Sequence, residues 1–454
     1  MERWWNKLIS AVCAGVGVLC LAGLAAVCCR LSRGTVGDGL AVAAVLVLLA
    51  VLAMLLLWKE GVSRERLLLM LLPVCAAMLF RALCLDFDSG DYNSFLTHWY
   101  AYFKENGGFA AIADSIGDYN VPYLNFMAAI SYLNLPDLYL IKLFSILFDV
   151  LLAWGGFRLT SALRGEREGD YVPLVAFALL MFLPTVVLNG ALWGQCDAIY
   201  GALVVHGVAQ VLKGRNRSSV ALMAVAFSFK LQTIFVLPLW GVLWLARKVR
   251  FRELLIFPLT YVITILPALL LGKPLSDILG VYFNQMGEYS SLTLSAPSVF
   301  QLIPYGMEVN DGLLSGLGVA AAVVLVLALL AAGWRLRGRL NREAVFAMAV
   351  VLAIGVPFFL PHMHERYFFL ADVLTLCWAC ANLRRVPAAV LTCASSLACY
   401  IVYLRLRYTF VLTIGGYRFV MLPEMLAMLA ALIFALTVMM REVACCFRGK
   451  EKTE

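Results

Sequence analysis

The chain has 454 residues, of which 63% are hydrophobic and only 14% are charged, and its formal net charge is +8. Soluble globular proteins have roughly 45–50% apolar and about 25% charged residues, so this composition excludes a water-soluble globular domain. The Lys and Arg residues lie in short segments between apolar runs. That distribution indicates the positive-inside pattern of a membrane protein and excludes a nucleic-acid-binding surface.

Apolar runs long enough to cross a bilayer recur from one end of the chain to the other. We therefore expect an all-α polytopic membrane protein with about 12–14 transmembrane helices. The first run is too long for the apolar part of a signal peptide, so we expect it to be retained. The expected spans are 8–29, 39–57, 67–85, 138–158, 171–188, 197–213, 218–229, 231–246, 253–271, 313–333, 343–360, 366–382, 386–404 and 417–440.

Charge bias orients these spans, because cytoplasmic loops carry the excess of Lys and Arg. With the N-terminus, including Arg3 and Lys7, in the cytoplasm, the basic connecting segments and the C-terminal tail also fall inside. This assignment requires that 121–133 does not cross, and a run of about 13 residues fits an interfacial or re-entrant helix better. The segments left outside are 86–137, 189–196, the turn near Lys230, 272–312, 361–365 and 405–416.

Two of these outer segments, 86–137 and 272–312, are large loops. They divide the chain into an N-terminal helix pair (1–66), a membrane module (67–271) that contains the first loop, the second loop, and the C-terminal helices (313–454). Every unusual polar cluster in the chain is thereby predicted to lie at one outer membrane face.

The first outer loop carries three aspartates in "LDFDSGDYNSFLTHW", and "GDYN" returns at 117–120. Asp86 and Asp88 fit a solvated helix edge. Asp91 opens an amphipathic aromatic stretch and is a candidate catalytic acid, with helix capping as the alternative. Asp118 heads the second stretch in the same way and is the second candidate.

Two further outer turns interrupt apolar runs. In "ALWGQCD" at 191–197, Gln195 and Asp197 either contact a ligand or cap the next helix. Lys230 has no charged neighbour for many residues on either side. An ionisable group at membrane depth is by default a functional-site hypothesis, and an anionic partner would suit it. The alternative is a lysine that extends to the outer interface.

The last cluster is "PHMHERYFFL" at 361–370. On a helix, His362 and Arg366 would share a face at i, i+4. His and Glu side chains also ligate zinc, but phosphate binding is the stronger interpretation, because Arg offers a planar fork and His can donate or carry charge. No nucleotide-binding motif occurs in the sequence. We therefore expect no metal and no cofactor, and a substrate that is already activated and borne by the membrane.

These stretches resemble motifs of the GT-C superfamily of glycosyltransferases, which use polyprenyl-phosphate sugars. The resemblance is closest to bacterial proteins related to the second mannosyltransferase of glycosylphosphatidylinositol assembly, and more distant to dolichyl-phosphate-glucose glucosyltransferases. The stretches that carry it are "SGDYNSFLTHW", "GDYNVPYL", "NGALWGQCDAIY", "FSFKLQTIF" and "PHMHERYFF", from about residue 81 to 381.

The resemblance implies an inverting hexosyltransferase of the plasma membrane, with cytoplasmic termini and an extracytoplasmic active site. Its partners would be a polyprenyl-phosphate donor of mannose or glucose, a glycan, lipid or protein acceptor of the cell envelope, and the lipid bilayer. Asp91 would be the general base. A lipid-linked glycan flippase and a polysaccharide polymerase or ligase are the alternatives. The other implied site residues are Asp118 (catalytic), Lys230, His362, His364, Glu365 and Arg366 (donor phosphate), and Tyr92, Trp193, Gln195 and Asp197 (substrate).

Overall fold

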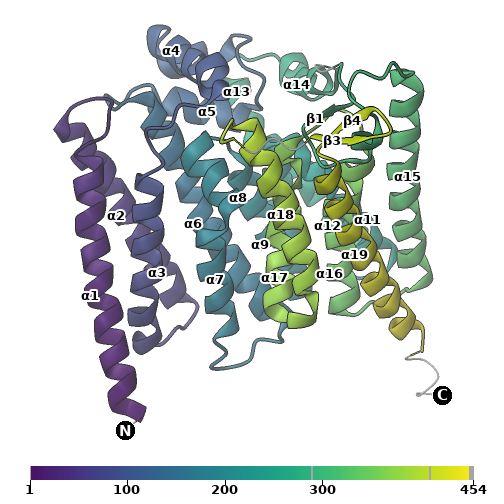
Figure 1. Cartoon of the computed structure of the whole chain (residues 1–454), viewed down its shortest axis with the longest axis horizontal. Coiled ribbons are helices and arrows are strands. Elements are labelled where there is room, and N and C mark those ends of the chain that lie inside the picture. Colours follow the sequence, from purple (N-terminus) through teal and green to yellow (C-terminus); the bar gives the residue numbers. More distant parts are fainter. Residues whose placement is uncertain (1, 288–289, 408–410, 449–454) are drawn as a thin grey trace. The chain divides into compact units, whose positions relative to one another are not determined.

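A computed structural model describes residues 2–287, 290–407 and 411–448 (Figure 1). The chain is built of α-helices with two short two-stranded β-pairings. It separates into two compact units. The first comprises Met1–Arg158, Asp170–Ala202 and Ile265–Leu279, and the second comprises Leu159–Gly169, Leu203–Thr264 and Gly280–Glu454. Parts of the expected charge pattern lie outside the described residues, namely the side chains of Arg3 and Lys7, residues 408–410 and Lys450.

Eight helices of the described chain are long and apolar enough to cross a membrane, or nine if the bent pair at 172–193 counts as one span. This confirms the all-α polytopic membrane fold. The bend of 47° falls at Pro184, whose ring prevents a continuous helix. The remaining expected spans are shorter or more highly charged helices. The expected span at 417–440 is wrong at its beginning, because 417–420 form a strand and the helix begins at Leu422.

The first unit holds most of the N-terminal half of the chain. Helices α1, α2 and α3 lie side by side (Figure 1). Helix α1 approaches α3 closely because Gly17, which faces Leu71, and Gly23, which faces Leu79, have no side chains. The helices are α1 Glu2–Cys28, α2 Val36–Lys59, α3 Arg64–Ala82, α4 Thr97–Glu105, α5 Val121–Ile130, α6 Asp137–Leu163, α7 Val172–Phe182, α8 Pro184–Val187 and the beginning of α9 Asp197–Leu212.

The short helix α5 bears on the topology, because its 10 residues cannot cross a bilayer. This agrees with the expected interfacial or re-entrant helix at 121–133.

The second large loop also begins within the first unit. Lys273 Nζ donates to the carbonyl oxygens of Ile112 at 3.3 Å and Asp114 at 2.7 Å, and Ser115 Oγ donates to Asp277 Oδ2 at 2.9 Å. Burial lowers the pKa of Lys273.

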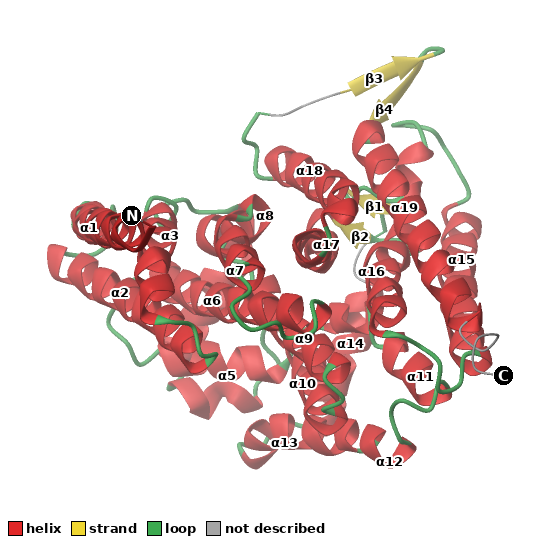
Figure 2. Ribbon diagram, turned by 90° about the horizontal axis from the view of Figure 1, so that it is seen from below, coloured by secondary structure: helices red, strands yellow, loops and turns green. Residues whose placement is uncertain are grey.

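The second unit contains the rest of the helices and both β-pairings. Helices α16, α17, α18 and α19 form a packed group, and the hairpin β3–β4 projects beyond it (Figure 2). The elements are α10 Asn216–Phe229, α11 Pro238–Leu245, α12 Phe251–Leu254, α13 Ile256–Leu270, α14 Leu275–Gly287, β1 Thr293–Leu294, α15 Asp311–Arg335, α16 Arg342–Phe359, β2 Met363–His364, α17 Phe369–Ala381, α18 Val386–Tyr403, β3 Val411–Ile414, β4 Tyr417–Val420 and α19 Leu422–Arg448. Helices α6, α9, α13 and α14 are divided between the two units.

Candidate functional site

Asp91 lies in the first unit at the start of a π-helical turn, Tyr92–Leu96, that leads into α4. Its side chain does not cap the helix. That role belongs to Ser89, whose Oγ accepts from the backbone N–H of Tyr92 at 3.1 Å and donates to the carbonyl oxygen of Trp193 at 2.8 Å. The capping alternative for Asp91 is therefore wrong, because the hydroxyl two residues earlier satisfies the helix start.

The carboxylate of Asp91 is half-buried and accepts hydrogen bonds from two side chains that follow it by about one hundred residues. Trp193 Nε1 donates to Oδ2 at 3.2 Å, and Gln195 Nε2 donates to the same oxygen. Both donors are buried, and Trp193 is fully so. The orientation of this carboxylate is thus set by rigid neighbours, which is what a positioned acid or base requires.

Gln195 also joins the two "GDYN" stretches. Its Oε1 accepts a hydrogen bond of 3.0 Å from the hydroxyl of Tyr119, which belongs to the second stretch, while its Nε2 donates to Asp91 in the first. The Tyr119 ring packs edge-on against Trp99 with centroids 5.3 Å apart. We name Asp91, Tyr119, Trp193 and Gln195 the acidic cluster. Asp118, beside Tyr119, is exposed.

Two of the three chain segments that meet in the acidic cluster contain a π-helical turn. The second, Leu188–Trp193, ends at Gly194, whose φ of 81° lies in the left-handed region that favours glycine. This turn brings the N–H of Gln195 back to the carbonyl oxygen of Asn189 at 2.9 Å. Asp197 is fully buried and accepts a hydrogen bond of 2.7 Å from Asn189 Nδ2. Such π-turns are rare and occur often at functional sites.

The other aspartates of the first loop hold the turn between α1 and α2. Asp88 pairs with Arg33 at 3.0 Å, and Asp86 accepts from the backbone N–H and hydroxyl of Ser32. Tyr92 is buried, and its hydroxyl accepts from Arg33 Nη1 at 2.9 Å and donates to the carboxylate of Asp137 at 3.0 Å. Burial is the main cause of the raised pKa of Tyr92.

Sequence reasoning missed two buried cations that support the acidic cluster. Lys142 Nζ on α6 donates to the carbonyl oxygens of Cys84, Leu85 and Phe87, at 3.1, 2.8 and 2.6 Å, and so fixes the end of α3 just before the aspartates. Arg81 pairs with Asp149 at 2.9 Å, and both side chains are fully buried. The sequence feature that could have identified Lys142 and Arg81 is the one used for Lys230, namely a charged residue within an apolar run.

In the second unit, Lys230 lies at the break between α10 and the 3₁₀ turn Leu231–Phe235. Its backbone is extended, with φ −151° and ψ 130°, and its side chain is buried. A helix C-terminus carries partial negative charge, which favours a cation there. Phe235 at the end of the turn lies 6.1 Å, between ring centroids, from Tyr367 beside the histidine cluster.

The histidine cluster, residues 362–366, is not helical at its start. His362 has φ 61°, His364 lies in β2, and a 3₁₀ turn covers Glu365–Phe368. The expectation that His362 and Arg366 share a helical face is therefore wrong. Strand β2 pairs in parallel with β1, which joins the loop 272–312 to this cluster. The left-handed backbone of His362 is held by its N–H, which donates to Leu292 O at 2.8 Å, and by Nδ1, which lies 2.8 Å from Ser291 O.

Glu365 is the buried centre of the histidine cluster. Its Oε1 lies 3.2 Å from Arg366 Nη1, and its Oε2 lies 3.8 Å from His364 Nδ1. The ring of His364 also lies 5.2 Å from that of Tyr367. The hydrogen-bonded ion pair with Glu365 orients the guanidinium of Arg366, whereas the imidazole of His364 lies near the same carboxylate at a distance too long for a hydrogen bond. In the described part of the chain, no three His, Cys, Asp or Glu side chains gather as a metal site would need.

The fold and these clusters define a helical membrane protein that carries positioned acidic and basic side chains in its connecting segments. The sequence model of glycosyltransferase family 87 matches residues 119–361, more than half of the 454 residues. The chain therefore belongs to glycosyltransferase family 87 and is a membrane glycosyltransferase. None of the curated proteins compared with the chain matches it.

Proposed function

We propose that this glycosyltransferase moves a hexose, mannose or glucose, from a polyprenyl-phosphate donor to a glycan, lipid or protein acceptor of the cell envelope. The reaction takes place on the extracytoplasmic side of the plasma membrane, and both chain termini are cytoplasmic. The likeness to bacterial proteins related to the second mannosyltransferase of glycosylphosphatidylinositol assembly supports this donor class. The Lys- and Arg-rich connecting segments support the orientation.

The observation that carries the proposal is the placement of Asp91, a half-buried carboxylate that caps no helix and is oriented by Trp193 and Gln195. In the proposed reaction Asp91 accepts the proton of the acceptor hydroxyl. The hydroxyl oxygen attacks the anomeric carbon, the bond from that carbon to the phosphate oxygen breaks, and the configuration inverts. General-base catalysis of this kind contributes roughly 10²–10⁴-fold to the rate.

Lys230, His364 and Arg366 are proposed to hold the donor phosphate and the negative charge that it gains as it departs. Glu365 would act as a positioning residue, because it is buried against both His364 and Arg366. His362 is proposed to line the same phosphate site. Their predicted gathering with the acidic cluster at one outer face stays a prediction.

Beside the acidic cluster, Asp118 is proposed as an exposed second acid that contacts the acceptor. Gln195 is proposed to contact substrate beside Asp91. Tyr92, Trp193 and Asp197 are buried and bonded within the chain, so their proposed contribution is to shape this substrate site.

The test is sugar transfer by the purified full-length protein from a short-chain polyprenyl-phosphate hexose. Asp91→Asn should lower kcat by roughly 10²–10⁴-fold. The matched control Asp88→Asn removes an exposed acid from the same loop and should stay within about twofold of wild type, because exposed ion pairs contribute little. Wild-type turnover by Asp91→Asn on a verified acceptor would show that the assigned base is wrong.

The donor is tested in the same assay. Arg366→Lys should raise the KM for the donor, because an ammonium does not replace the planar fork of a guanidinium on phosphate. Transfer from a pyrophosphate-linked donor alone would favour a polymerase or ligase. Lipid-linked glycan flipping in vesicles with no sugar transfer would favour a transporter.

A further inference from the structure

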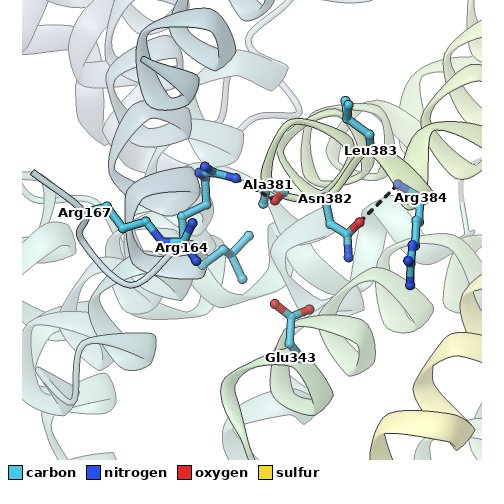
Figure 3. Close-up of a pocket in the computed structure, with 8 residues that line it drawn as sticks. Arg164, Arg167, Glu343, Ala381, Asn382, Leu383 and Arg384 are labelled. Atoms are coloured by element: carbon cyan, nitrogen blue, oxygen red, sulfur yellow. Dashed lines mark hydrogen bonds between the residues drawn. The ribbon is translucent and has the colours of Figure 1, made fainter. Parts of the chain in front are cut away.

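A polar cavity lies at helix ends of the second unit, and none of the histidine-cluster residues lines it. Its volume is about 480 Å³, and eight residues line it (Figure 3). They come from the end of α6, the start of α16 and the segment that joins α17 to α18. The lining side chains are Leu163, Arg164, Arg167, Glu343, Ala381, Asn382, Leu383 and Arg384.

Three of these eight side chains are guanidinium groups, opposed by one carboxylate. Figure 3 shows Arg164 and Arg167 on one side of the cavity, Arg384 on the other, and the carboxylate of Glu343 directed into the space between them. Arg164 Nη1 donates to the carbonyl oxygen of Ala381 at 3.3 Å, and Asn382 Oδ1 accepts from the backbone N–H of Arg384 at 3.1 Å. Capping of helix ends accounts for Arg164 and Asn382, but not for the exposed Arg167 and Arg384.

Glu343 supplies a second, independent feature of the cavity. It lies in the first turn of α16, where the capping role is already filled by Asn341, whose Oδ1 accepts from the N–H of Ala344 at 2.6 Å. Glu343 Oε2 is buried and faces the side chain of Trp378 and the positive charge of Arg385. In Figure 3 the Glu343 carboxylate is directed into the cavity, where it can accept a hydrogen bond from a hydroxyl-bearing ligand.

An exposed apolar strip leads away from the cavity along α18. Leu383, Val386 and Val390 are 78%, 39% and 59% exposed, and their spacing of three and four residues places them on one side of the helix. Beside a cluster of arginines at the end of a membrane-spanning helix, such a strip suits lipid chains whose headgroup occupies the polar cavity.

We propose that this cavity binds the headgroup of an anionic phospholipid that carries a hydroxyl group. Arg164, Arg167 and Arg384 hold the phosphate, the headgroup hydroxyl donates to Glu343, and the acyl chains run along the exposed strip of α18. Phosphatidylglycerol has this chemistry. The proposal is independent of the donor and acceptor of the sugar transfer.

The test is thermal unfolding of the detergent-purified full-length protein with added phosphatidylglycerol, phosphatidic acid, phosphatidylethanolamine or glycerol 3-phosphate. Phosphatidylglycerol should raise the Tm most. The double variant R167Q/R384Q should bind it roughly 30-fold more weakly, from two lost arginine contacts. The matched control R335Q/R339Q removes two exposed arginines at the end of α15 and in the turn that follows it, neither of which lines the cavity. This variant should bind within about twofold of wild type.

Glu343→Met should bring the affinities for phosphatidylglycerol and phosphatidic acid to within about twofold of each other, because the contact that distinguishes the two headgroups is lost. Three results would overturn the proposal. The first is that phosphatidylethanolamine raises the Tm as much as phosphatidylglycerol does. The second is that free glycerol 3-phosphate raises the Tm as much, which would indicate a site for soluble anions. The third is that R335Q/R339Q loses as much affinity as R167Q/R384Q, which would indicate a general effect of charge.

Discussion

Arg81 and Asp149 provide a sharp test of how the first unit holds the acidic cluster. Arg81 Nε donates to Asp149 Oδ2 at 2.9 Å with both side chains fully buried, and Arg81 Nη1 donates to the carbonyl oxygen of Met181 at 2.8 Å. The pair thereby joins α3, α6 and the end of α7. The Asp149 carboxylate also packs against Gly190, where a Cβ would come within 3.1 Å of Oδ1. Gly190 belongs to the π-helical turn that ends at Trp193.

The expected change in the free energy of unfolding depends on which charge each substitution leaves buried. Asp149→Leu leaves a buried guanidinium that retains only carbonyl acceptors, and an uncompensated buried charge costs about 3–5 kcal/mol. The double variant Arg81→Met with Asp149→Leu removes both charges and keeps similar volume, so it should be destabilised less than Asp149→Leu alone. The expected coupling free energy is about 2–3 kcal/mol.

The assay is equilibrium unfolding in mixed detergent micelles, followed by far-ultraviolet circular dichroism. The matched control is Asp88→Asn, which breaks the 3.0 Å pair between the exposed Asp88 and the partly exposed Arg33 and should cost less than about 1 kcal/mol. If Asp149→Leu costs no more than this control, or if the double variant shows the sum of the two single effects, the pair does not hold the helices as inferred. Sugar transfer should fall with stability, since Asp149 supports the turn that carries Trp193.

Two further predictions concern packing and capping. Gly318→Ala should lower the free energy of unfolding by about 1–3 kcal/mol, because the added Cβ would lie 2.4 Å from the carbonyl oxygen of Phe359. The control Gly316→Ala, on the same helix, places its Cβ where nothing lies within 4 Å, so it should be neutral or slightly stabilising. Chemical unfolding measures both variants. Ser89→Ala should cost about 1 kcal/mol of stability and lower kcat, while Ser94→Ala, exposed on the following turn, should change neither; equal behaviour of the two would refute the assigned cap.

Much of the fold class followed from local sequence. Runs of apolar residues predicted the helices, and the length of 121–133 predicted that it would not cross. The isolated Lys230 marked the end of a helix. Fewer helices of the described chain are long enough to span by themselves than the expected 12–14, because a window of apolar residues does not reveal where Pro184 bends a helix or where a short helix such as α11 stops.

The candidate site was predicted only residue by residue. "GDYN" occurring twice marked Asp91 and Asp118, but the partner that joins the two stretches, Gln195, follows Asp91 by 104 positions. No local pattern encodes such a pairing. The same holds for β1 and β2, whose pairing gives His362 a left-handed backbone that helical periodicity could not predict.

By itself, the sequence determined that this chain is an α-helical membrane protein with charged groups confined to a few segments, because the bilayer permits only backbone that satisfies its own hydrogen bonds. Only the tertiary structure decided what each charge does. Ser89 caps the helix, and Asp91 instead accepts hydrogen bonds from Trp193 and Gln195. Glu365 is buried next to His364 and Arg366. These outcomes depend on distances between segments far apart in the chain, which packing sets and composition does not.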